Sequence, residues 1–192
     1  MKRILTILAL VIGINASLSA QNTVFLSEVC YEHLFLEADN GLKSSWGMGV
    51  PQIGVDYHVM DMAYVGASIG ASFGNVDYDF GKAGRTYSNI YDLRIPMRAG
   101  ISLLDRNLKL DTGPFLNFTV GGESTYYTGK TETTTKFKDM DFSRVSLGWS
   151  INLRLFELFK IGYSFMLTDS AYGEGGDAGF LSIGLSLALE ME

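Results

Sequence analysis

The sequence predicts an all-β fold, an eight-stranded antiparallel up-and-down transmembrane β-barrel, and three observations support this prediction. First, apolar residues alternate with small or polar ones in segment after segment, which is the period of a β-strand. Second, the small residues are mostly Gly and Ser, which weaken a water-facing sheet but fit a crowded lumen. Third, short connections alternate with long polar ones, as in barrels with short turns at one end and long loops at the other.

The last expected strand shows the alternation most clearly. One face holds Leu181, Ile183, Leu185, Leu187 and Leu189, and the residues between them are Ser182, Gly184, Ser186 and Ala188. The apolar faces of the regular strands carry no Lys, Arg, Asp or Glu. A Lys or Arg that faces lipid at the midplane costs roughly 2–4 kcal/mol. We therefore expect the apolar faces to point at hydrocarbon and the small and ionic residues to surround the barrel axis.

The first twenty residues have the pattern of a secretory signal peptide. Lys2 and Arg3 precede an apolar stretch at 4–14, and small residues lead to a cleavage site after Ala20. The domains are thus a signal peptide at 1–20 and an outer-membrane barrel at 21–192. No later stretch approaches the roughly 18 consecutive apolar residues of a membrane helix. Strands are then the remaining way to cross a bilayer, which places the exported protein in the bacterial outer membrane.

The first four strands are expected at residues 23–38, 48–59, 64–76 and 88–103. The first is the least regular, because Glu28, Glu32 and His33 interrupt apolar residues that fall on both faces. The third sets an apolar row against a row of Gly and Ser, and the fourth sets an apolar row against Asp and Arg. A short turn at 60–62 and long loops at 39–47 and 77–87 connect these strands.

The last four strands are expected at residues 108–121, 140–154, 158–168 and 179–190. Short turns at 104–107 and 155–157 and long loops at 122–139 and 170–178 complete the meander. Pro96 and Pro114 fall inside strands and each removes a ladder donor, so we expect a local bulge or a bound water there. Aromatic residues collect near both ends of the strands, which is typical of the two girdles at membrane–water boundaries.

Composition argues against several classes of function. Removing the signal peptide takes away Lys2 and Arg3, which leaves 13 of the 15 Lys and Arg against 21 Asp and Glu and moves the net charge from −6 to −8. An acidic chain is a poor ligand for nucleic acid. Cys30 is alone, so no internal disulfide forms. With only His33 and His58 and no G-x-S-x-G pattern, we expect no catalytic site, no metal site and no cofactor.

Charged residues on the small-residue faces form the main constellation of the sequence. An eight-stranded barrel is only just wide enough for its side chains, so charges in the lumen need partners. The favoured interpretation is a structural ion-paired plug, and the alternative is a gated ion path. The members are Asp56, Asp92, Arg94, Arg98, Lys109, Asp111, Arg144, Arg154 and Lys160, with Glu190 near the C-terminus.

The 122–139 segment is the most distinctive loop. It is rich in Thr and Tyr, which form strands readily, so it can extend the hairpin above the membrane. A protruding ribbon can capture a protein or glycan partner outside the cell by pairing at its edge. The alternative is a long loop that only faces water.

Several motifs give the chain a family resemblance. The resemblance rests on five short segments. They are Tyr91–Met97, Gly113-Pro114-Phe115, Asp141-Phe142, Lys160–Tyr163 and Leu167-Thr168. On these residues the last hundred positions resemble the small outer-membrane β-barrel family of Bacteroidetes, the PorT-like group. The resemblance implies an eight-stranded barrel that contacts outer-membrane lipid and is inserted by the barrel-insertion machinery.

The sequence favours an integral outer-membrane barrel with a plugged lumen, no enzymatic activity, and a structural or surface-interaction role through its long loops. The main alternative is a soluble secreted lipocalin-like barrel that binds a small apolar ligand, with its apolar faces turned inward. A third hypothesis is an outer-membrane lipid-modifying enzyme.

Overall fold

The computed structural model describes residues 23–36, 42–176 and 178–190. The predicted signal peptide at 1–20 lies outside the described residues, as does the side chain of Glu190. The strands are β1 (Thr23–Leu36), β2 (Leu42–His58), β3 (Ala63–Asp79), β4 (Arg85–Leu103), β5 (Leu108–Thr128), β6 (Thr131–Lys136), β7 (Val145–Leu155), β8 (Phe159–Met166) and β9 (Ala178–Glu190). Two single-turn 3₁₀ helices are η2 (Gly81–Ala83) and η3 (Phe137–Asp139). Among the described residues, no helix is long and apolar enough to span a membrane.

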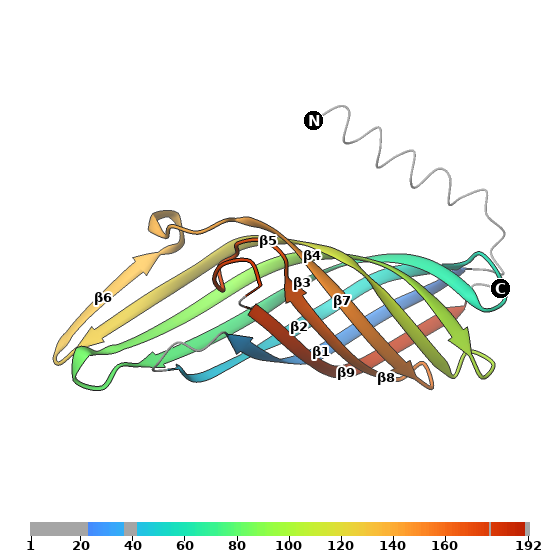
Figure 1. Cartoon of the computed structure of the whole chain (residues 1–192), viewed down its shortest axis with the longest axis horizontal. Helices are drawn as coiled ribbons and strands as arrows, with labels where there is room; N and C mark the ends of the chain where they lie inside the picture. Colours follow the sequence, from blue (N-terminus) through green and yellow to red (C-terminus); the bar gives the residue numbers. More distant parts are fainter. Residues whose placement is uncertain (1–22, 37–41, 177, 191–192) are drawn as a thin grey trace, which may run out of the picture.

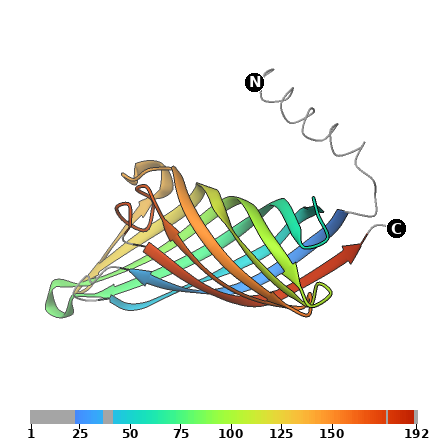
Figure 2. The same cartoon turned by 45° about the vertical axis from the view of Figure 1, so that its right-hand side comes forward.

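Eight of the strands close into an antiparallel ring (Figure 1). The order around the ring is β1–β2–β3–β4–β5–β7–β8–β9, and β9 pairs with β1 from Val24↔Glu190 to Leu36↔Ala178. Apart from the closing pair of β1 and β9, neighbouring ring strands follow one another along the chain, which makes the barrel an up-and-down meander (Figure 2). The predicted fold class is therefore confirmed. The ninth strand, β6, stands outside the ring and pairs only with β5 in the described part of the chain.

The two faces of the wall differ as the alternation predicts. In β9, Leu189 is 70% exposed and Leu187 is 59% exposed, whereas Ser186 between the neighbouring leucines is 0% exposed. The same pattern runs through β1, where exposed and buried residues alternate from Val24 to Phe35. Apolar side chains thus cover the outside of the barrel, and small, polar and charged side chains fill the inside.

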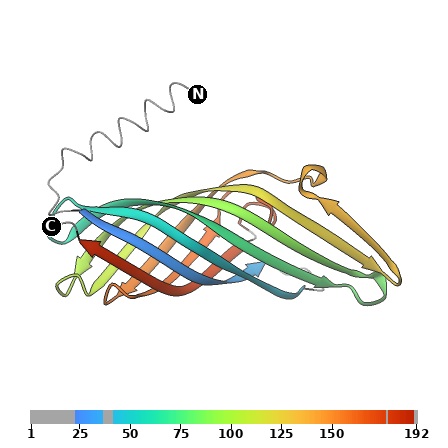
Figure 3. The ribbon, with the colours of Figure 1, turned by 180° about the vertical axis from the view of Figure 1, so that it is seen from behind.

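Two tight turns at one end of the barrel use non-glycine residues with left-handed backbone. Phe156 and Glu157 have φ of 53° and 54°, and the Leu158 amide donates to the Leu155 carbonyl at 3.1 Å. Two successive positive φ values match the twist of the flanking strands and form a tight turn within the three-residue connection at 156–158. The turn after β4 also has positive φ at Leu104, Asp105 and Arg106. The start of β1 and the end of β9 lie at this same short-turn end (Figure 3).

The other end of the barrel differs from the sequence-based prediction. Much of the loops expected at 77–87 and 122–139 is strand, because β3 continues to Asp79, β4 begins at Arg85 and β5 continues to Thr128. Backbone pairing between β4 and β5 persists to Arg85↔Tyr127, and β6 adds a further strand opposite Glu123–Thr128. The apolar alternation ends where the wall leaves the barrel ring, whereas Thr and Tyr sustain the strands beyond it.

The prolines disturb the wall less than expected. Pro96 stays aligned with Phe115 and Pro114 stays aligned with Trp149, with no register shift at either position, so neither proline makes a bulge. Register shifts occur instead between Val50 and Ile53 and beside Tyr91. The barrel keeps its side-chain parity through both prolines, which keeps charged residues off the outer face.

Glycine at position 66 leaves room for an ion pair in the lumen. A Cβ on Gly66 would lie 2.1 Å from Asp56 Oδ1 and 2.7 Å from the Val55 carbonyl oxygen. Asp56 Oδ1 accepts a hydrogen bond from Arg98 Nε at 2.6 Å. The small residue therefore makes space for a carboxylate that its guanidinium partner holds in place.

Substituting Gly66→Ala is expected to lower the free energy of unfolding by about 1–3 kcal/mol, the usual range for overpacking. The measurement is urea unfolding of the refolded full chain. Gly121→Ala is the matched control, since its Cβ would meet nothing nearer than Tyr91 Cδ2 at 3.5 Å. Equal losses for the two variants would contradict the account of Gly66.

Candidate functional site

An ion-paired node crosses the lumen of the barrel. Arg154 on β7 donates from Nε to Glu28 Oε1 of β1 at 2.7 Å and from Nη1 to Asp111 Oδ2 of β5 at 2.6 Å. Tyr64 and Asn152 donate to the two oxygens of Asp111 at 2.9 Å and 2.7 Å. Three separate strands of the ring are thus joined across the barrel axis by one guanidinium.

Two further cations complete the node. Lys160 Nζ on β8 donates to Glu28 Oε2 at 2.7 Å, so the Glu28 carboxylate binds a different cation with each oxygen. Arg98 on β4 pairs with Asp56 and also donates from Nη1 to the Ser68 hydroxyl. These side chains are almost wholly buried, and each charge has an opposite charge within reach. An unpaired charge in such a site is costly, whereas a paired and hydrogen-bonded charge is tolerated.

Arg94 forms a second ion pair closer to the long-loop end. Its Nη1 donates to Glu32 Oε1 of β1 at 2.6 Å, and its Nε donates to Asn117 Oδ1 at 3.2 Å. The guanidinium carbon also lies 4.8 Å from the centre of the Phe180 ring. An aromatic ring attracts a cation that lies over its face, so Phe180 stabilises the positive charge of Arg94.

An apolar layer closes the lumen above Arg94. Tyr172, in the segment between β8 and β9, inserts its ring edge-on to Phe180 with 5.3 Å between the ring centres. Its hydroxyl donates to Asp92 Oδ2 at 2.8 Å, and Thr119 donates to the other oxygen of Asp92 at 2.7 Å. A Cβ on Gly74 would meet the Tyr172 hydroxyl at 2.5 Å. The other buried members of this layer are Leu34, Val76, Ile90, Phe115, Met166 and Ala178.

Two of the sequence-predicted residues lie elsewhere. Lys109 is buried at the short-turn end, where its Nζ pairs with Glu157 Oε1 at 2.8 Å and not with the central node. Arg144 lies outside the lumen, so its predicted place is wrong. It is exposed, and its guanidinium carbon lies 4.6 Å from the Phe137 ring centre. The reason is that β7 begins at Val145, five residues later than the strand expected at 140–154.

The structure also brings in residues that the prediction left out. Glu28 and Glu32 are the main carboxylate partners of Arg154 and Arg94, although the sequence showed them only as interruptions of an irregular strand. Their equal spacing from Cys30 places all three on one face of β1, and this parity was the available signal. The aromatic residues near strand ends, expected in the two girdles, include Tyr172 and Tyr64, but both of these are buried inside the barrel.

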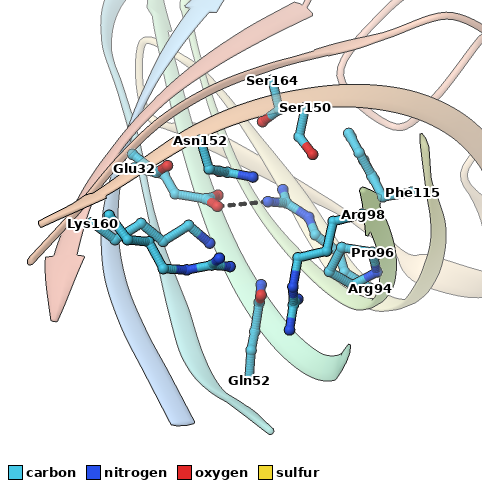
Figure 4. A pocket seen from close by; sticks show the side chains of 12 residues that line it. Glu32, Gln52, Arg94, Pro96, Arg98, Phe115, Ser150, Asn152, Lys160 and Ser164 are labelled. Carbon is cyan, nitrogen blue, oxygen red and sulfur yellow. Dashed lines mark hydrogen bonds and ion pairs between the residues drawn. The ribbon is translucent and has the colours of Figure 1, made fainter. Parts of the chain in front are cut away.

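A cavity of about 40 Å³ lies between the node and the apolar layer. Figure 4 shows Arg94, Arg98, Gln52 and Asn152 at its wall. This space holds only a few water-sized molecules. No group of three or more His, Cys, Asp or Glu residues that could hold a metal ion occurs in the part of the chain that the structure describes.

Beyond the barrel ring, the strand ends form an extension, which we define as residues 75–79, 85–89 and 122–136 (Figure 1). An outward aromatic row marks its base, where the Phe73 ring centre lies 5.4 Å from that of Trp46 and 5.3 Å from that of Tyr91, with the rings tilted to one another. Immediately above, Asn75 Nδ2 donates to Asn89 Oδ1 at 2.9 Å. The outer face thus changes from apolar through aromatic to polar along a single strand pair.

An ion pair and a hydroxyl contact hold the extension together. Arg85 Nε donates to Asp77 Oδ1 at 2.7 Å, and the Tyr126 hydroxyl donates to the Ala83 carbonyl of η2. The hydrogen bond from Arg85 holds the pKa of Asp77 below its ordinary value of 3.8. The extension is therefore an ordered sheet with its own polar contacts.

Comparison with known proteins relates the geometry to a class of barrels. No family model matches the sequence, and no curated protein matches it. A solved structure of Ail, the attachment invasion locus protein of Yersinia pestis, matches with a TM-score of 0.52 at 10% identity, over 88% of this chain and 99% of that chain. This chain has the fold of an outer-membrane β-barrel.

Two other solved barrels match over a similar span. Neisserial surface protein A gives a TM-score of 0.44 at 12% identity, over 88% of this chain and 97% of that chain. OprG from Pseudomonas aeruginosa gives 0.47 at 12% identity, over 88% and 96%. At such identities the similarity to Ail concerns the fold alone.

Replacing the central cation is expected to destabilise the barrel strongly. Arg154→Gln leaves Glu28 and Asp111 without a guanidinium, and breaking a buried pair in this way costs about 3–5 kcal/mol. The free energy of urea unfolding measures the loss. Arg144→Gln serves as the control and is expected to change it by less than about 0.5 kcal/mol, because Arg144 is exposed. Similar losses for both variants would contradict a central role for Arg154.

The Asp77–Arg85 pair predicts an acid sensitivity of the extension. Because the folded pKa of Asp77 is lowered, the pair stabilises the fold fully above the ordinary value of 3.8 and is lost as the pH falls through the lowered value. The protection factors of the β3–β4 end amides, which compare each rate with that of an unprotected amide at the same pH, should therefore fall below about pH 4. Asp77→Asn should show fast exchange at neutral pH already. Asp79→Asn is the control, since Asp79 pairs with Lys43 only at 3.6 Å and both side chains are about half exposed.

Proposed function

We propose that this protein is an integral protein of the bacterial outer membrane, with a lumen plugged by its own side chains and a structural or surface-interaction role. One observation supports the membrane location above all others: the outer face of a closed barrel is apolar, while its ion pairs are inside. A water-soluble barrel would have the opposite arrangement, because burial of apolar surface drives its folding. Lipid is the solvent that such an exterior needs.

The arrangement of the wall supports a particular position in the bilayer. The row of Trp46, Phe73 and Tyr91 suits one membrane–water boundary, where aromatic rings are enriched. The hydrogen-bonded pair of Asn75 and Asn89, in which Asn75 is buried, then lies above this boundary. The short-turn end faces the periplasm in this proposal, and the extension stands outside the cell.

The interior supports a plug more than a gated ion path. The node around Arg154 spans the axis, and Tyr172 with its apolar neighbours lies across the mouth. The cavity between them is about 40 Å³. We propose that the ion pairs serve to fix the barrel's shape and fill its lumen.

The proposal includes further expectations from the sequence. The chain is exported by the signal peptide at 1–20, inserted by the barrel-insertion machinery, and surrounded by outer-membrane lipid. The motifs from Tyr91 onward support placing it in the PorT-like group of Bacteroidetes barrels. We propose no enzymatic activity, since His33 lies on the exposed face of β1 and His58 is buried at the short-turn end. The 122–139 segment is the proposed contact for a protein or glycan outside the cell.

The soluble lipocalin-like alternative requires apolar faces that meet in a dry centre. The leucines of β9 point outward instead, and the buried centre holds Arg154 and its carboxylates. The geometry opposes this alternative.

A detergent-extracted full chain is expected to show heat-modifiable gel mobility, because a closed barrel resists unfolding until it is boiled. Ile151→Arg, which places a cation on the outer face, is expected to reduce the folded band, since such a change costs roughly 2–4 kcal/mol in lipid. Thr134→Arg on the exposed β6 is the matched control and should leave the band unchanged.

Release of the protein into the aqueous fraction without detergent would overturn the membrane location. Steady nanosiemens conductance in planar bilayers would overturn the plug and favour the gated ion path.

A further inference from the structure

The outer edge of β6 is the one long strand edge of the extension that the described structure leaves without a strand beside it. β6 pairs with β5 from Glu123↔Lys136 to Thr128↔Thr131, and nothing pairs with its other side in the described ranges. All six of its residues are exposed. A strand edge presents a row of backbone N–H and C=O groups, which makes it a template for another strand.

The composition of β6 suits pairing with a strand. Four of its six residues are Thr, which favours strands, and it contains neither Pro nor Gly. Charged residues on an edge usually discourage pairing in an arbitrary register. Here the charges are one Glu and one Lys, at positions 132 and 136, so a register that matches them removes that obstacle.

The sequence of β6 is self-complementary in one antiparallel register. In an antiparallel ladder, alternate residues direct their backbone groups to opposite sides, so two copies of one edge can pair only when residues of equal parity face each other. In such a register one residue of the strand lies directly opposite the same residue of the second copy, and we name the register by this central residue. Centring on Thr134 places Glu132 opposite Lys136 of the second copy, twice over by symmetry, and Thr133 opposite Thr135.

The neighbouring registers lack this match. Centring on Glu132 or Lys136 sets like charges directly opposite, which is destabilising. In the registers centred on Thr133 or Thr135, Glu132 does not lie opposite Lys136 of the second copy. Glu132, Thr134 and Lys136 share one face of the strand, so both ion pairs of the matched register form on the same side of the joined sheet.

We propose that β6 is a homophilic docking edge that pairs with β6 of a second copy of this chain in the register centred on Thr134. The inference rests on the proposed function, because it needs the extension to stand outside the membrane. The two-fold axis of an antiparallel edge pair runs perpendicular to the sheet, and the contact is isologous.

The direction of the extension decides how the two copies face each other. The extension continues the barrel wall along the long axis of the molecule (Figures 1 and 3). A two-fold axis perpendicular to that wall lies in the plane of the membrane and therefore inverts the second barrel. The paired copies sit in two facing membranes, as in contact between cells. A six-residue edge binds weakly by itself, so many copies on each surface are needed for firm contact.

A charge-swap experiment tests the register. Glu132→Lys sets Lys opposite Lys, and Lys136→Glu sets Glu opposite Glu, so each variant alone is expected to lose self-association roughly tenfold. A mixture of the two variants restores both ion pairs and is expected to associate as the wild type does. The measurement is sedimentation equilibrium of the folded full chain in detergent, with heat-modifiable mobility as the check that each variant is folded. Association should also weaken at high salt, since exposed ion pairs are screened.

Mixing two bacterial populations, one displaying each variant, tests the facing geometry, with co-aggregation of the two populations expected. Failure of the wild type to self-associate, single variants that associate like the wild type, or a mixture that does not recover would each overturn the docking edge. Cells that cluster only after addition of a foreign protein or glycan would overturn it as well. All these outcomes leave the proposed membrane location intact if the folded band persists.

Discussion

The guanidinium of Arg154 is the interaction on which the rest of the interior depends. It joins Glu28 of β1 to Asp111 of β5 from its own place on β7, so it links strands that are distant in the sequence and far around the ring. An eight-stranded lumen has little room, and charges inside it need partners at hydrogen-bond distance. Small residues such as Gly66 follow from this requirement, because a Cβ there would collide with Asp56.

The same closure determines the exterior. Since every second residue of the wall points inward to the ion pairs, the residues between them form an apolar cylinder. That cylinder ends at Phe73 and Tyr91, and the polar contact of Asn75 with Asn89 follows within two residues. The strands continue past this boundary as a water-facing sheet whose free edge is β6. One set of strands thus makes both a barrel with an ion-paired lumen and an ordered sheet beyond it.

Alternation in the sequence predicts the strands, the up-and-down order and the inward row of charges, because side-chain parity is a local property. It does not predict where a strand begins, which is why Arg144 was wrongly placed inside. The sequence did not predict Glu28 and Glu32 as partners of the lumen cations, because the inward face of β1 also carries the apolar residues Val24, Leu26 and Leu34. The insertion of Tyr172 depends on Phe180 and Asp92 in other segments, and no local pattern reports such tertiary packing.

The outer face of the wall must meet hydrocarbon, and a nitroxide label at Leu187, in a Cys30→Ser background, tests this directly. Leu187 is outward and exposed, three residues before the end of β9 at Glu190. In lipid bilayers the label should relax readily with dissolved oxygen and hardly with a water-soluble nickel reagent, whereas a label at the turn residue Asp105 should show the reverse. A label at Leu187 that responds to the nickel reagent as strongly as the one at Asp105 would contradict the account.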